Sequence, residues 1–309
     1  MLLPFIFAVL AAVFWAITNH IDKYMISRAV KNADHRALVV VSSLVAGLVM
    51  AIIYAFICKF DLSFDWQSIL ILFGNSALYA LTLVFWFKAI NRDDPTIVVI
   101  MFQLIPVFLL LISPLLLHEE AIRPLQLVGG IVTTLAAISV TYEPSKKKFN
   151  KKKLVTLGLM TCTSLGYALW FVIERYVNQN HDFNQTTFWS NVTLFLVGVS
   201  IIVFIKSYRK SFNKMLKSNG VKVISINLIN ELFNSFGGVF STLAGTMASV
   251  AVVSFISQGI QPFAVMILGI LIAKLLPKMH KEKITKKEII KRTITIAICA
   301  AGLALIEFG

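Results

Sequence analysis

One carboxylate and three amides fall together inside a long apolar stretch of the sequence. Asn227, Asn230, Glu231 and Asn234 are followed by no charged residue until Lys274. On a helix, Asn227, Glu231 and Asn234 share one face, and an ionisable group inside an apolar helix is by default a functional candidate. We predict that this face lines a cavity, where Glu231 binds a cationic group or takes up a coupling proton. The alternative is a protonated, structural Glu231 beside amides that hydrogen-bond neighbouring helices.

Further amides and aromatic rings lie in apolar segments, several of them close to prolines. Pro106 and Pro262 leave backbone carbonyls without a donor, and such carbonyls either line a cavity or are satisfied locally. Aromatic faces stack on substrate rings or cations, although they also form interfacial belts and lipid-facing packing. Besides the four residues above, the candidates for binding substrate or ions are Asn75, Gln103, Gln258, Gln261, Trp15, Tyr79, Tyr167 and Trp170.

No pattern in the sequence indicates catalysis, a cofactor or a metal. There is no His-Glu-x-x-His motif and no paired aspartate motif. The three cysteines, Cys58, Cys162 and Cys299, have neither disulfide-framework nor metal-site spacing. We therefore predict that the protein is not an enzyme, has no cofactor and holds no metal.

The composition places these candidates in a membrane. Of the 309 residues, 58% are hydrophobic and 14% are charged, with a mean hydropathy of +0.81, whereas soluble domains carry about 25% charged residues. The net charge is +14, but the basic residues lie between long apolar runs. The sequence therefore predicts the lipid bilayer as a partner, and not nucleic acid.

Charged residues divide the chain into ten apolar segments, most of them near the length that spans a bilayer. A backbone in lipid must satisfy its own hydrogen bonds, so these segments are expected to be helices, and the fold class is all-α integral membrane. The predicted segments are 3–19, 37–58, 66–87, 95–117, 124–142, 154–173, 183–205, one from about 223, one from about 248, and about 289–306.

The basic residues are distributed unequally between the two ends of these segments. Of the 29 Lys and Arg residues, 26 fall in the odd-numbered loops, which leaves 3 for the even-numbered ones. Since cytoplasmic loops carry an excess of Lys and Arg, we predict that loops 143–153, 206–222 and 274–292 are cytoplasmic and that both termini lie outside a plasma (inner) membrane. Segment 206–222 is either a short interfacial helix or a solvated basic loop.

The two halves of the chain resemble each other weakly but in order. Ile21–Tyr24 aligns with Ile173–Tyr176 at an offset of 152, and Asn75 aligns with Asn230 at an offset of 155. Each half has five predicted helices, and an odd number places the second half upside down in the membrane, with a central cavity between the two. The predicted organisation is a first repeat over 1–142, a basic linker over 143–153 and a second repeat over 154–309.

Each of the two stretches aligned at offset 152 contains an acidic residue followed by a basic residue near the end of a predicted helix. These pairs are Asp22 with Lys23 and Glu174 with Arg175. We interpret both pairs as anchors at the membrane interface, where charged side chains reach water.

The segment from Asn75 to Val140 resembles the drug/metabolite transporter superfamily, and in particular its EamA-type domain. The resemblance is carried by Ala77–Leu78–Tyr79, Pro95, Gln103–Phe108 with its central proline, Leu116, Leu117, Glu120, Gln126 and Gly129. It implies ten helices, a cavity between the halves, and export or exchange of small metabolites. Many members are thought to keep both termini in the cytoplasm, whereas the basic residues of this sequence favour termini outside.

Taken together, the sequence predicts a secondary transporter, an exporter or exchanger of small polar metabolites such as amino acids or amines. Transport by alternating access needs only one chain because the repeat is internal, although a dimer is compatible with it. Two alternatives stay open, namely a membrane-embedded channel or scaffold, and a lipid-modifying enzyme without a recognisable catalytic motif.

Overall fold

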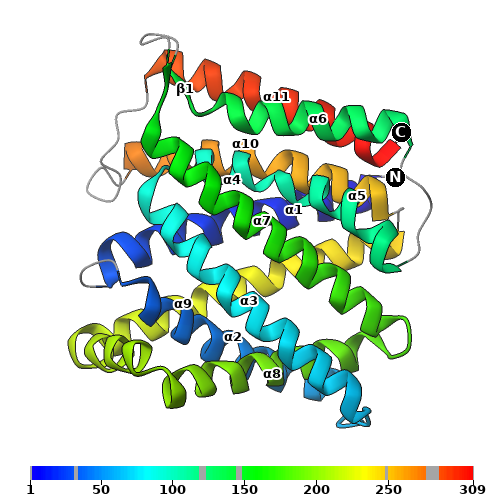
Figure 1. Cartoon of the computed structure of the whole chain (residues 1–309), viewed down its shortest axis with the longest axis vertical. Helices are drawn as coiled ribbons and strands as arrows, with labels where there is room; N and C mark the ends of the chain where they lie inside the picture. The colour runs from blue at the N-terminus through cyan, green and yellow to red at the C-terminus, as the bar shows by residue number, and fades with distance from the viewer. Residues whose placement is uncertain are drawn as a thin grey trace.

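The protein is a bundle of helices that cross one another at steep angles (Figure 1). The computed structural model describes residues 2–30, 34–117, 123–143, 148–247, 250–275 and 285–308. The helices of the first half are α1 (Leu2–Tyr24), the π-helical turn η1 (Met25–Ala29), α2 (His35–Ile57), α3 (Trp66–Arg92), α4 (Pro95–Phe102), α5 (Leu104–Leu117) and α6 (Pro124–Ser139). Those of the second half are α7 (Lys151–Asn178), α8 (Phe183–Phe204), α9 (Lys206–Met247), α10 (Val250–Leu275) and α11 (Lys286–Phe308).

Eight helical segments in the described part of the chain are long and apolar enough to cross a membrane. They are Leu3–Ala29, His35–Ile57, Trp66–Arg92, Pro95–Leu117, Lys151–Asn178, Phe183–Phe204, Ile256–Leu275 and Lys286–Phe308. Helix α6 is apolar but shorter, and α9 begins in a basic segment. Large apolar side chains such as Leu81, Phe56 and Leu115 are exposed on the outside of the bundle, as lipid contact requires. The protein is therefore an integral, multi-pass membrane protein, and the total of ten spans stays a prediction.

Side-chain caps fix where several helices begin. Asp34, Asp65, Asp94 and Asp182 each accept a hydrogen bond from a backbone N–H in the first turn of the helix that follows, and Asn150 does the same for α7. Such caps satisfy N–H groups that have no partner inside the helix. Charged residues placed the predicted boundaries near Asp65, Asp94 and Asp182, and the caps give those boundaries their physical basis.

The fourth predicted segment is one span interrupted at its middle. Helix α4 ends at Phe102, and α5 begins at Leu104. Proline 106 has no N–H, and its ring excludes a regular hydrogen bond to the carbonyl of Phe102, four residues earlier. Gln103 lies at this break with its backbone still near helical values (φ −63°, ψ 0°). Helices α4 and α5 therefore form one membrane-length segment, Pro95–Leu117.

The basic segment 206–222 is helical, as expected for the interfacial helix and not for the solvated loop. It is the start of α9, and the chain bends at Asn219, whose φ is −147°. Its apolar side chains Tyr208, Phe212 and Met215 pack against the hydrophobic core of the protein. The expectation that this face lies on the lipid surface is therefore wrong, because the rest of the bundle covers it.

The linker between the halves is shorter than predicted. Strand β1 (Tyr142–Glu143) pairs antiparallel with β2 (Lys148–Phe149), and α7 already begins at Lys151. Residues 144–147 of the predicted basic linker lie outside the described residues.

Two pairs of helices come close enough for their backbones to touch. Helix α2 packs along α8, and α6 packs along α11 at one edge of the bundle (Figure 1). A Cβ atom at Gly47 of α2 would lie 2.6 Å from the backbone nitrogen of Phe195 in α8, and one at Gly129 of α6 would lie 2.5 Å from the carbonyl oxygen of Gly302 in α11. Small residues at such crossings let membrane helices approach closely.

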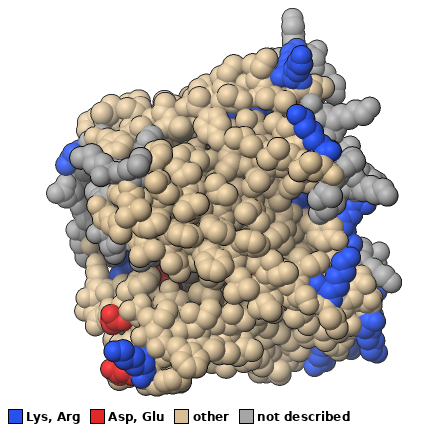
Figure 2. Space-filling model, turned by 180° about the vertical axis from the view of Figure 1, so that it is seen from behind, with Lys and Arg blue, Asp and Glu red and all other residues tan. Residues whose placement is uncertain are grey.

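Most basic residues gather at the edge of the bundle opposite the two termini (Figure 1 and Figure 2). Both termini lie at the same edge in Figure 1. In the reverse view, Figure 2 shows most of the visible Lys and Arg side chains along the other edge, with a broad uncharged surface between. The predicted segregation of basic residues is therefore present in three dimensions.

Candidate functional site

A large cavity runs into the middle of the bundle. Its volume is about 1890 Å³, and helices of both halves line it. Near the termini the wall includes helix ends, at Ile57, Phe183 and Phe308, whereas its opposite end is formed around Asp22 and Trp86. The cavity thus opens on the side of the termini and ends blindly toward the side of the basic loops.

The blind end holds a buried carboxylate, that of Asp22, which was predicted to lie at the membrane interface. Asp22 of α1 accepts one hydrogen bond from Trp86 Nε1 (2.8 Å) and one from Asn230 Nδ2 (2.9 Å). The Glu231 carboxylate is near enough to interact electrostatically with Asp22. Because both donors are neutral and the two carboxylates repel each other in a site of low polarity, this end of the cavity favours a positively charged occupant.

Two side-chain amides at the same end each have one polar atom without a hydrogen-bond partner among the described residues. They are Asn19 Nδ2 and Asn230 Oδ1. Each residue is only 5% exposed, and each lines the cavity. Buried polar groups are almost always hydrogen-bonded, so one free donor and one free acceptor at a cavity wall indicate a place for water or substrate.

Another carboxylate lies nearer the mouth. Glu174 of α7 lines the cavity, and its Oε1 accepts a hydrogen bond from Ser190 Oγ of α8 (2.8 Å). Tyr167, Trp170 and Glu174 are spaced by three and four residues, so they lie on one face of α7.

A row of aromatic rings connects the two acidic regions. Ring centroids are 5.3 Å apart for Trp86 and Phe102, 5.1 Å for Phe102 and Tyr167, 5.6 Å for Tyr167 and Tyr79, and 5.5 Å for Tyr79 and Trp170. All five line the cavity. These distances are typical of interacting aromatic pairs, and the faces of such rings attract cations.

Nine of the twelve residues predicted for the site line this cavity. They are Trp15, Tyr79, Tyr167, Trp170, Asn230, Glu231, Asn234, Gln258 and Gln261. They come from α1, α3, α7, α9 and α10, so residues far apart in the sequence line one cavity.

The other three predicted residues are buried between helices and are absent from the cavity lining. Asn75 donates to the carbonyl of Trp170 (3.2 Å), and Gln103 donates to the carbonyl of Val99 (3.4 Å). Asn227 donates to Ser42 Oγ of α2 (3.0 Å). The prediction that Asn227 shares the cavity face with Glu231 is wrong because α9 packs between α1 and α2, and the side chain at 227 is directed to α2.

The interpretation of Asp22 and Glu174 as interface anchors is also wrong. Consecutive helix residues point about 100° apart, so Asp22 faces the cavity while Lys23 turns away. The Lys23 ammonium donates to the carbonyls of Ile90 and Asp93, at 2.8 Å each, and so caps the carboxyl end of α3. The signal that could have found the two carboxylates is the alignment itself, since the offset of 152 pairs Asp22 with Glu174.

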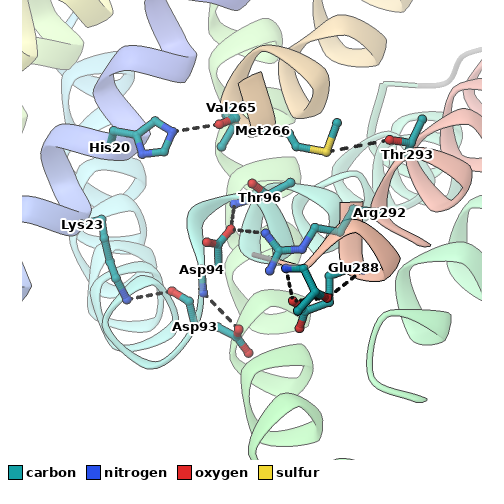
Figure 3. A network of polar contacts seen from close by, with 11 residues as sticks. His20, Lys23, Asp93, Asp94, Thr96, Val265, Met266, Glu288, Arg292 and Thr293 are labelled. Atoms are coloured by element: carbon teal, nitrogen blue, oxygen red, sulfur yellow. Dashed lines mark hydrogen bonds and ion pairs between the residues drawn. The ribbon is translucent and has the colours of Figure 1, made fainter. Parts of the chain in front are cut away.

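Polar contacts join the two halves beyond the blind end of the cavity (Figure 3). Arg292 of α11 forms a buried ion pair with Asp94 at the start of α4 (Nη1 to Oδ1, 2.9 Å), with side chains only 8% and 2% exposed. His20 Nε2 lies 2.9 Å from the carbonyl oxygen of Val265, which joins α1 to α10. Burial raises the pKa of the neighbouring Asp93 carboxyl. These contacts join the two halves of the chain on the side of the basic loops.

The fold is shared with proteins of known structure. No curated protein matches the chain, but 23 chains of solved structures do. One is a protein solved by crystallography, which is 14% identical, covers 98% of this chain and 94% of its own, and has a TM-score of 0.52. At this identity the likeness concerns the fold alone.

The first part of the chain is similar to a known family of transporters. Residues 2–142 match the model of the EamA-like transporter family. The match includes the stretch Asn75–Val140 on which the resemblance rests, and it ends where the first repeat was predicted to end. The resemblance is therefore confirmed over residues 2–142, which are similar to the EamA-like transporter family.

Proposed function

We propose that the protein is a secondary transporter that carries small organic amines through the central cavity by alternating access. The observation that carries this proposal is the buried Asp22 carboxylate at the blind end of the cavity, which has two neutral donors and Glu231 as its neighbours. The basic residues among the lining are Arg123 and Arg175, and both lie near the mouth. An ammonium group would neutralise the acidic end and satisfy the free oxygen of Asn230.

Amines fit this site better than amino acids, the other substrates that the sequence left open. The carboxylate of an amino acid would enter beside Asp22 and Glu231 with no basic side chain to meet it among the described lining residues of the inner half. Like charges in a partly dehydrated site repel strongly. A substrate that is cationic as a whole avoids this repulsion.

Two inverted five-helix repeats account for the helix packing. Helix α1 packs on α9 and α10, and its counterpart α7 packs on α3 and α5, while α2 pairs with its counterpart α8 and α6 with α11. Exchanging the two halves leaves this set of contacts unchanged, which supports ten spans around a twofold axis in the membrane plane. An open cavity on one side and the Asp94–Arg292 pair on the other correspond to one state of an alternating-access cycle, and a closed end argues against a continuous channel.

The Lys and Arg distribution supports a placement of the basic loops in the cytoplasm of a plasma (inner) membrane. The open mouth then faces outside. A single chain is sufficient for this mechanism, and a dimer is compatible with it.

Flux into proteoliposomes tests the proposal. We expect the wild-type protein to take up radiolabelled monoamines down a concentration gradient. Glu231→Gln is expected to reduce the rate of uptake or to abolish the dependence of that rate on a pH gradient, because one of two neighbouring carboxylates is lost. Asp61→Asn is the matched control, since Asp61 lies in an exposed turn, bonded to Ser63, and is absent from the cavity lining. If a panel of amines produces no flux above that of empty liposomes, the substrate class is wrong.

A further inference from the structure

We propose that the cavity is built for an elongated diamine, with one ammonium group held at the blind end by Asp22 and Glu231 and the other held by Glu174. This inference rests on the proposed function and narrows it from amines in general to amines with a positive charge at each end.

The inner site has a ready set of partners for one ammonium group. Asp22 uses one oxygen for Trp86 and the other for Asn230, and each carboxylate oxygen can accept a further hydrogen bond. The Asn230 Oδ1 atom has no hydrogen-bond partner among the described residues and belongs to a residue that is 95% buried. An ammonium group carries three donors, and these acceptors surround one position at the end of the cavity.

The outer site also offers a carboxylate, on the opposite half of the chain, although the basic residues Arg123 and Arg175 line the cavity on this side as well. The Glu174 carboxylate accepts a hydrogen bond from Ser190 Oγ and lines the cavity. Asn178, one turn farther along α7, also lines the cavity, and its Oδ1 atom has no hydrogen-bond partner among the described residues. Asp22 and Glu174 occupy equivalent positions in the two halves, so one substrate would contact both halves at once.

The spacing of the two sites along α7 favours a ligand longer than a small monoamine. Asp22 and Glu231 are both close enough to Tyr167 to interact with its hydroxyl group. Glu174 lies seven residues farther along α7, which corresponds to about 10 Å of helix axis. The second positive charge must therefore be separated from the first by a chain of several methylene groups.

The wall between the two sites suits such a chain. Tyr79, Tyr167 and Trp170 contact one another between the acidic ends, and their faces offer apolar contact to methylene groups and attraction to any ammonium group that passes. The spacing of carboxylate, aromatic wall and carboxylate matches the order of charge, methylene chain and charge in a diamine.

Competition experiments with the full-length protein in proteoliposomes test this inference. The transported label is a monoamine, and the competitors are butylamine, octylamine, putrescine and diaminooctane. We expect Glu174→Gln to weaken competition by diaminooctane about tenfold and competition by butylamine or octylamine less than twofold, because only the long diamine reaches both sites. Glu174→Asp, which retains the charge, is expected to keep the preference for diaminooctane, and Asp61→Asn is the control for a lost carboxylate on the same side.

Three outcomes would overturn the inference. One is an equal effect of Glu174→Gln on the monoamine and diamine of the same length. Another is wild-type protein in which putrescine competes as well as diaminooctane, a comparison that needs no variant to fold. The third is monoamine flux that no diamine inhibits, which rejects the outer site while leaving the proposed function intact. Absence of all amine flux instead rejects the proposed function itself.

Discussion

Replacing Asp22 with asparagine is expected to abolish amine transport while the protein still folds. The amide has nearly the shape of the carboxylate, so the packing among α1, α3 and α9 is preserved. The negative charge at the blind end is lost. Asparagine has one acceptor oxygen in place of two, so its NH2 group faces one of the two donors, Trp86 Nε1 or Asn230 Nδ2, that hydrogen-bond to the carboxylate in the wild type. Removal of one partner of a buried charged hydrogen-bonded pair costs about 2–5 kcal/mol in binding, which lowers the affinity for a cation about 30-fold or more.

The measurement is initial-rate uptake of a radiolabelled monoamine by proteoliposomes that contain equal amounts of folded protein. Thermal unfolding in detergent checks that Asp22→Asn is folded, and Asp61→Asn checks that the loss of a carboxylate elsewhere has no such effect. Wild-type uptake by a folded Asp22→Asn variant would show that the cation does not bind at this carboxylate.

Replacing Arg292 with methionine is expected to destabilise the protein strongly. The long apolar side chain of methionine fills the space of the arginine stem, but it removes the guanidinium that pairs with the buried Asp94 carboxylate. Breaking a buried ion pair from one side costs about 3–5 kcal/mol, and Asp94 also caps α4 through the Thr96 N–H (2.9 Å), so the charge cannot turn away to water. We expect the melting temperature in detergent to fall by many degrees.

The matched control is Lys287→Met on the same helix, because that lysine is exposed. Surface charges contribute about 0–1 kcal/mol, so this variant should melt close to the wild type. The double variant Asp94→Asn with Arg292→Met should recover part of the loss, since no buried charge is left unpaired. An unchanged melting temperature for Arg292→Met alone would mean that the pair does not hold the two halves together.

The sequence was sufficient to predict the class of fold and most helix boundaries. Apolar length and the charges between segments predicted ten helices, and the described part of the chain contains eight helical segments of membrane length. Both properties depend only on local composition. The aspartates before α3, α4 and α8 mark the boundaries of the apolar segments in the sequence. In the structure the same residues are the N-caps of these helices. The break at Gln103 follows from Pro106 by the same local rule.

The direction in which a polar side chain points was harder to predict. Asn75, Gln103 and Asn227 have the right chemistry for the cavity, but each bonds to a backbone or side-chain partner between helices. A helix buried on several sides has more than one face for polar residues, and only the packing of its neighbours decides which face meets the cavity. Asp22 was misplaced for a related reason, since Lys23 beside it made the helix end look like an interface.

The most direct test of the account is whether an amine protects the cavity wall from a chemical label. Leu109 of α5 lines the cavity, and Leu109→Cys in a chain without the three native cysteines places one thiol there. We predict that a membrane-impermeant thiol reagent added from outside labels this cysteine, and that saturating diaminooctane slows the labelling several-fold in this background but not when Asp22→Asn is added. Labelling at the same rate with and without the amine would contradict the claim that the central cavity binds amines.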